Sequence, residues 1–158
     1  MQVDKNACFE ALLHQLQTEL TTTLSASKDA AEYATNQESK ADSKYDTQGL
    51  EASYLAAGQA LHAKQQGEAI RTLRALKPYL TADRTRIELG AVFACNFGES
   101  EEWFYFAPVA GGEIVVVDEM EITILTAQSP LANQLKGRGV GYSFASKLGS
   151  KTTVAFVA

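Results

Sequence analysis

The chain has 158 residues, a hydrophobic fraction of 46% and a formal net charge of -5. That length accommodates one ordinary domain or two small ones, and that hydrophobic fraction can build a core. The negative net charge argues against generic binding to nucleic acids or anionic membranes, which reward an excess of Lys and Arg. We therefore expect the partner to be a protein or a metal.

The two cysteines and two histidines form no recognisable site. Cys8 and Cys95 belong to neither a CxxC pair nor a Cys/His set, which predicts reduced thiols. His14 and His62 are predicted to lie on the surface. No signal segment opens the sequence, and no apolar run approaches the roughly 20 residues that span a bilayer. These features predict a cytoplasmic protein that contacts no membrane.

The segment from Asp4 to about Thr35 lacks Pro and Gly and carries one narrow apolar stripe, which predicts a long helix. Because most other positions are polar, the stripe requires a single partner helix. The stripe consists of Phe9, Leu13, Leu16, Leu20, Leu24, Ala31 and Ala34.

A second stripe between about Asp42 and Leu76 predicts that partner helix, and Pro78 is predicted to end it. The polar residues 36–43 would form the tip of an antiparallel coiled-coil hairpin. Arms of about 30 residues would reach roughly 45 Å, which suggests a probe or spacer. A dimeric coiled coil with no other role is the alternative interpretation. The second stripe consists of Tyr45, Leu50, Tyr54, Ala57, Leu61, Leu73 and Leu76.

The second half of the chain reads as a small strand-rich domain with one short helix. Ser129 and Pro130 supply an N-cap and a first-turn proline for a helix of about two turns. The aromatic run 103–106 is predicted to be core, and 137–141 a turn. The whole pattern predicts an α+β fold with domains at residues 1–80 and 81–158. The strands are expected at residues 86–96, 101–108, 113–117, 122–125 and 151–157.

The order and spacing of several motifs resemble the Gre family of bacterial transcript-cleavage factors, over essentially the whole chain. The resemblance implies a coiled coil that enters the secondary channel of bacterial RNA polymerase, and an FKBP-like antiparallel β domain docked at the channel's rim. The motifs are Arg86-Ile87-Glu88-Leu89-Gly90-Ala91-Val92, Ile122-Thr123-Ile124-Leu125, Ser129-Pro130-Leu131-Ala132 and Leu135-Lys136-Gly137, with Lys40 and Tyr45 near the tip.

The resemblance also implies which residues act. Glu38 and Asp42 would be the tip acids, with Asp46 one turn further on, and these three would hold a Mg²⁺ shared with the docked polymerase near the 3′ end of the nascent RNA. Carboxylates are the hard oxygen ligands that such a site requires. Gln128, Ser129 and Pro130 match the turn that contacts the polymerase. The isolated protein is expected to be a monomer that binds no cofactor and catalyses nothing alone.

The sequence departs from the family at both of these sites. When it is aligned on Lys40 and Tyr45, the family's second tip acid falls on Ala41, and Asp42 stands where the family usually has Asn. A shift of one residue turns a helical side chain by about 100°. Gln128 replaces an acid that is often found in the contacting turn. Stimulated RNA cleavage and channel binding without cleavage therefore both stay open, with a prolyl isomerase or chaperone role as a third alternative.

Overall fold

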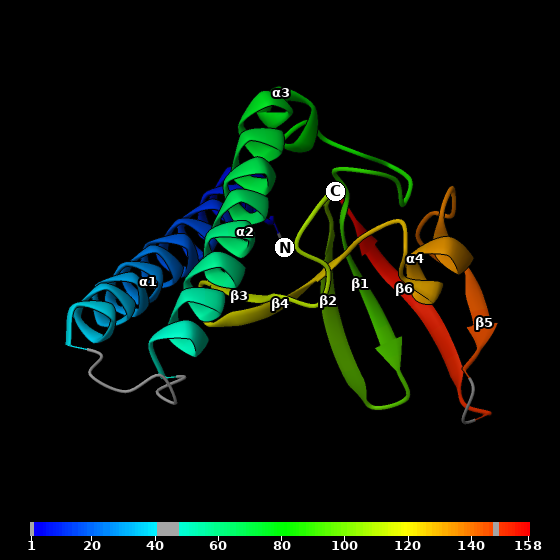
Figure 1. Ribbon diagram of the computed structural model, residues 1–158. Helices are drawn as coiled ribbons and strands as arrows, with labels where there is room; N and C mark the ends of the chain where they lie inside the picture. Colours follow the sequence, from blue (N-terminus) through cyan, green and yellow to red (C-terminus); the bar gives the residue numbers. More distant parts are fainter. Residues whose placement is uncertain (1, 41–47, 147–148) are drawn as a thin grey trace. The chain divides into compact units, whose positions relative to one another are not determined.

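The computed structural model describes residues 2–40, 48–146 and 149–158, without the side chains of residues 30, 34–40, 48, 49 and 52 (Figure 1). The α+β class predicted from the sequence is confirmed. The helices are α1 (Lys5–Lys40), α2 (Gln48–Ala75), α3 (Lys77–Leu80) and α4 (Pro130–Leu135). The strands are β1 (Val92–Phe97), β2 (Ser100–Phe106), β3 (Ile114–Val117), β4 (Met120–Leu125), β5 (Ser143–Ala145) and β6 (Lys151–Val157).

The chain forms two compact units. The sheet unit comprises Met1–His14 and Thr72–Ala158, and the arm unit comprises Gln15–Arg71. The division differs from the expected boundary between residues 80 and 81, because the base of the helical hairpin belongs to the sheet unit. Cys8, Phe9 and Leu80 are fully buried there. None of the described helices combines the length and the apolar composition that a membrane span needs.

Six strands form one mixed sheet in the order β3-β4-β2-β1-β6-β5. The resemblance implied an antiparallel domain, but β2 and β4 pair in parallel, with Trp103 opposite Ile122 and Phe106 opposite Leu125. The chain reverses direction twice between them, because β3 runs along the outer edge and a tight turn brings β4 back between β3 and β2. Two reversals restore the original direction. The short strand β5 was not predicted.

Alternation along the strands places the core on both faces of the sheet. On one face, Phe93 and Phe104 stack with their ring centroids 5.3 Å apart, and Ala132 and Leu135 of α4 pack against the same cluster. On the other face, Tyr105 is fully buried and its hydroxyl donates to the carbonyl of Leu80, 3.0 Å away. The hairpin base and α4 therefore cover opposite faces of β2.

The arm unit packs on a different side of α2 from the one predicted. Leu50, Tyr54 and Leu61 of the second stripe are 53%, 70% and 58% exposed. The least exposed positions are small or polar apart from one isoleucine, and Ser27 Oγ of α1 donates to the carbonyl of Ala56 at 3.3 Å. The predicted stripe therefore faces solvent at these three residues, whereas Leu73 at its C-terminal end is fully buried. The least exposed positions are Ser53, Ala56, Gln59, Ala63, Gln66 and Ile70.

This arrangement predicts opposite outcomes for two truncations on α2. Leu61→Ala is expected to change the free energy of unfolding by less than about 0.5 kcal/mol, because the side chain is exposed. Ile70→Ala should cost about 2 to 5 kcal/mol, because Ile70 is 4% exposed. Urea denaturation measures both.

Sedimentation of the wild-type chain and of Leu50→Gln/Leu61→Gln serves as the control. A dimer that the double variant dissociates would mean that the exposed stripe is buried between two copies. In that case Leu61→Ala would also be costly, contrary to the expectation.

Candidate functional site

Of the predicted tip acids, only Glu38 lies in a described element, the last turn of α1. This helix runs through Glu38 to Lys40, so residues 36–40 are helical and not part of a loop, contrary to the expected tip at 36–43. The physical reason is that this stretch contains neither Gly nor Pro, and Gln, Glu and Lys favour helix. The side chain of Glu38 and the whole of Asp42 and Asp46 lie outside the described residues.

The described residues were also compared with the side-chain groupings that bind metal ions. Within residues 2–40, 48–146 and 149–158, no group of three or more His, Cys, Asp or Glu side chains is arranged to hold a metal ion. His14 and His62 are exposed, as predicted. Cys8 and Cys95 are free, as predicted, and both are buried. Burial raises the pKa of the Cys8 thiol to about 11 and that of Cys95 to about 12, so neither is a reactive thiolate near neutral pH.

The predicted docking turn is well defined and leads into α4. Ser129 is the N-cap: its Oγ accepts a hydrogen bond from the backbone N–H of Ala132 at 3.4 Å, and Pro130 occupies the first turn. The N–H of Ser129 donates to the carbonyl of Thr126 at 2.9 Å, which closes the turn. Gln128 and Pro130 are exposed and Ser129 is half-buried. The turn therefore presents Gln128 and Pro130 to solvent on a rigid base.

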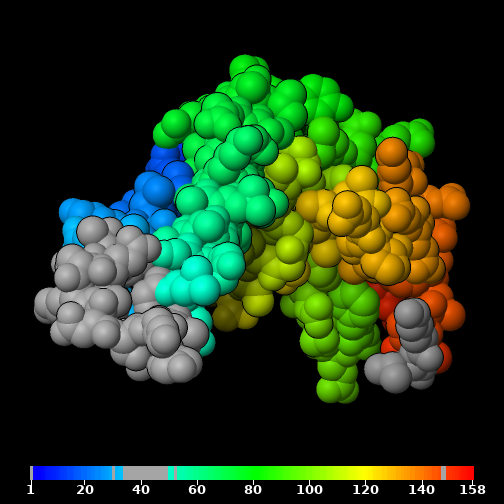
Figure 2. Space-filling model, in the orientation of Figure 1, coloured from blue at the N-terminus to red at the C-terminus, as the bar shows by residue number. Residues whose placement is uncertain are grey.

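The docking turn forms one wall of a surface pocket of about 720 Å³, which we call the turn pocket. The opposite wall is the loop between β2 and β3. Figure 2 shows the yellow-green atoms of that loop on the same face as the yellow-orange atoms of the docking turn. Pro108, Val109 and Ala110 are apolar, whereas Thr126, Gln128 and Ser129 carry polar groups. The pocket is lined by Pro108, Val109, Ala110, Gly111, Gly112, Ile124, Leu125, Thr126, Ala127, Gln128 and Ser129.

Sequence reasoning missed this second wall. Gly111 and Gly112 fall between the strands expected at residues 101–108 and 113–117. In the structure Ala110 and Gly112 have φ angles of 68° and 90°. A Cβ on Gly111 would lie 3.0 Å from the side chain of Thr126. Two adjacent glycines directly before a β-branched strand were the available signal, since they allow both the turn and the close approach.

Comparisons with known proteins give distant likenesses. No protein-family model and no curated protein matches the chain. The crystal structure of the GreA factor homolog 1 (Gfh1) protein of Thermus thermophilus is 20% identical, over 92% of this chain and 94% of that chain, with a TM-score of 0.33. Thermus aquaticus Gfh1 is 20% identical over 94% of both chains, with a TM-score of 0.33. A structure titled as the transcription factor Gfh1 is 18% identical over 93% of both chains, with a TM-score of 0.34. At these identities and TM-scores, the likeness supports no statement about the fold or function of this chain.

Proposed function

We propose that this protein binds a bacterial RNA polymerase through its sheet unit and uses the tip of its helical hairpin to stimulate the polymerase's own cleavage of backtracked RNA. The motif resemblance to the Gre family motivates the proposal. The observation that carries it is α1, an unbroken helix of 36 residues that includes Glu38 and extends about 54 Å. A helix of this length suits delivery of a carboxylate into a narrow channel.

In this proposal, the protein contributes only metal ligands to the cleavage of the RNA. Two-metal hydrolysis of a phosphodiester needs a second Mg²⁺ and an activated water, and that ion stabilises the attacking oxygen. In the proposal Glu38 and Asp42 supply carboxylate oxygens to the ion, and Asp46 adds charge nearby. Gln128, Ser129 and Pro130 hold the protein on the polymerase. The protein is not an enzyme by itself, because the polymerase supplies the reaction centre.

A second candidate function is channel binding without cleavage. It is favoured by the displacement of the tip acids, with Ala41 at the family's second acidic position and Asp42 beside it. Such a protein would regulate transcription by occupying the channel.

The test is RNA cleavage in a stalled, backtracked bacterial elongation complex with Mg²⁺. We expect the wild-type protein to release short 3′ fragments. Glu38→Ala/Asp42→Ala should lower the cleavage rate at least 10- to 100-fold, because mutating even a residue that only hydrogen-bonds to a metal ligand lowers activity by that factor. Binding to the polymerase, measured in the same complexes, should be unchanged.

The matched control is Asp29→Ala/Glu32→Ala, which removes two exposed carboxylates from the same helix. It should cleave like the wild type. If the wild type binds without releasing fragments, the second candidate function replaces the first. If it does not bind the polymerase, both are wrong.

A further inference from the structure

Charge is divided along the sheet unit in an unusual way. Residues 89–121 contain seven acidic residues and no Lys or Arg, whereas residues 122–158 contain four basic residues and no Asp or Glu. The strand order places the acidic part at the β3-β4-β2 side and the basic part at the β6-β5 side. A chain with a net charge of -5 therefore still has a segment, residues 122–158, whose charged side chains are all basic. The acidic residues are Glu99, Glu101, Glu102, Glu113, Asp118, Glu119 and Glu121, and the basic residues are Lys136, Arg138, Lys147 and Lys151.

The centre of this basic part is the loop that follows α4, together with the segment before β1. The N–H of Ile87 donates to the carbonyl of Arg138 at 2.8 Å, and the N–H of Gly137 donates to the carbonyl of Ile87 at 2.7 Å. This pairing joins two segments about 50 residues apart and brings Arg86 beside Lys136 and Arg138. We call these three exposed side chains the cationic face. Figure 2 shows the green atoms of the first segment directly beside the orange atoms of the second.

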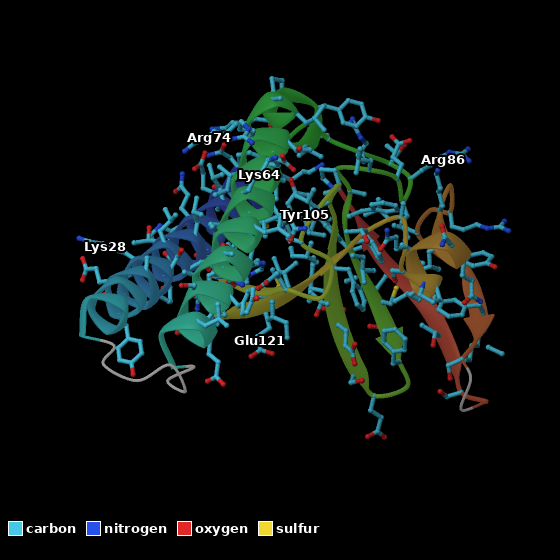
Figure 3. All side chains as sticks on the ribbon, viewed as in Figure 1. Lys28, Lys64, Arg74, Arg86, Tyr105 and Glu121 are labelled. Carbon is cyan, nitrogen blue, oxygen red and sulfur yellow. The ribbon has the colours of Figure 1, made fainter. Side chains whose placement is uncertain are left out.

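Both arginines of the cationic face are held in fixed orientations. Arg86 Nη1 donates to the carbonyl of Gly137 at 3.3 Å. The guanidinium of Arg138 lies over the ring of Tyr142, 4.4 Å from its centroid, and that ring stacks on Phe144. An arginine whose flat face is covered still directs its N–H groups outward. Because its side chain is already ordered, less conformational entropy is lost when a ligand binds. Figure 3 shows Arg86 pointing away from the sheet.

The cationic face has no ion-pair partner among the described residues. Elsewhere in the sheet unit, Arg84 pairs with Glu88 at 3.2 Å and Lys77 pairs with Glu10 at 2.6 Å. Among the residues that the structure describes, no carboxylate lies within ion-pair distance of Arg86, Lys136 or Arg138. Their charges are therefore available to an anionic partner.

We propose that the cationic face binds the phosphodiester backbone of a nucleic acid. Its three side chains carry charge of one sign, and the acidic side chain next to them in the chain, Glu88, is paired with Arg84 at 3.2 Å. An interface with an acidic protein would need an apolar or aromatic anchor at its centre. The described loop 136–142 exposes only one large apolar side chain, Val140, which is 64% exposed, and so it lacks the cluster that such an interface would need. The arrangement thus matches a backbone-contacting site, which depends on charge rather than on base sequence.

The experiment measures fluorescence anisotropy of a labelled 20-nucleotide single-stranded RNA and of a 20-base-pair DNA duplex, with the isolated full chain in 50 mM salt. We expect dissociation constants in the micromolar range for at least one of them. The logarithm of the association constant should fall with the logarithm of the salt concentration with a slope of about -2 to -3, because three phosphates are neutralised. The two probes distinguish single-stranded from duplex nucleic acid as the source of the phosphates.

The variant is Arg86→Gln/Lys136→Gln/Arg138→Gln, which should bind at least about 10-fold more weakly and lose most of the salt dependence. Its matched control, Lys28→Gln/Lys64→Gln/Arg71→Gln, removes the same charge from exposed positions of the arm unit and should bind like the wild type (Figure 3 labels Lys28 and Lys64).

Three results would overturn the proposal. In the first, the wild type binds neither probe. In the second, the two triple variants weaken binding equally. In the third, a polyglutamate peptide displaces the probe as effectively as unlabelled nucleic acid does. The last result would assign the face to an acidic protein. Because no polymerase is present in this experiment, its outcome is independent of the cleavage assay.

Discussion

Phe93→Ala is expected to lower the free energy of unfolding of the sheet unit by about 3 to 5 kcal/mol. Phe93 is a fully buried residue of β1, and its ring stacks on Phe104. Truncation removes the apolar surface of a whole ring and leaves a cavity that the sheet cannot close, because β1 is held by β2 on one side and β6 on the other. Urea denaturation followed by circular dichroism measures the loss.

Phe93→Leu is the control for this prediction. It keeps most of the apolar volume and loses only the ring stacking, so it should cost less than about 2 kcal/mol. Equal losses for the two variants would show that the position tolerates no change of shape, and the cavity argument would be wrong.

Replacing both cysteines by alanine is expected to reverse the pH dependence of stability between pH 9 and 10. Burial raises the pKa of Cys8 to about 11 and that of Cys95 to about 12, from 9 in the unfolded chain. The stability that these thiols contribute is therefore complete below pH 9. This stability is lost as the pH rises toward the pKa values of the thiols in the folded chain, because the unfolded chain releases its thiol protons at a lower pH. Each thiol contributes a slope of up to about -1.4 kcal/mol per pH unit.

Lys5 changes the free energy of unfolding in the opposite direction over the same pH range. Burial, with a smaller contribution from Arg84, lowers the pKa of the Lys5 ammonium from 10.5 to about 8, and this group donates to the carbonyl of Ala82. The folded chain releases this proton first, so stability rises from about pH 8 to 10.5. The wild type should lose stability between pH 9 and 10, because two thiols outweigh one lysine, whereas Cys8→Ala/Cys95→Ala should gain it.

Urea denaturation at pH 8, 9, 9.5 and 10 measures these slopes, and comparing slopes removes the constant cost of the two substitutions. Lys5→Met in the wild-type background is the control and should make the negative slope steeper. A double variant whose stability still falls between pH 9 and 10 would contradict the assignment to the thiols.

The sheet unit could be predicted largely from local patterns. Residues 151–157 form β6 as predicted, and the strands at 113–117 and 122–125 were placed within two residues. Ser129 and Pro130 correctly predicted the short helix α4, because an N-cap and a first-turn proline each act on the residues next to them. The aromatic run 103–106 is buried, as predicted.

The arm unit shows where local patterns are insufficient. The stripe through Leu50, Tyr54 and Leu61 has the spacing of a helix interface, yet it is exposed. A stripe becomes an interface only if the opposite helix offers a matching groove. Leu16 of α1 is buried, but beyond Leu20 the less exposed positions of this helix are the polar or small residues Thr23, Ala26 and Ser27. Small residues on both helices allow a close approach, whereas large leucines would separate them.

By itself, the sequence determined the elements: two long helices, most of the strands and the capped helix α4, since each depends on composition and spacing over a few residues. Only the tertiary structure decided the parallel pairing of β2 with β4, the turn pocket between residues 108–112 and 124–129, and the cationic face of Arg86, Lys136 and Arg138. These features join segments distant in the chain, and long-range pairing depends on the balance of all the contacts in the core rather than on any local pattern.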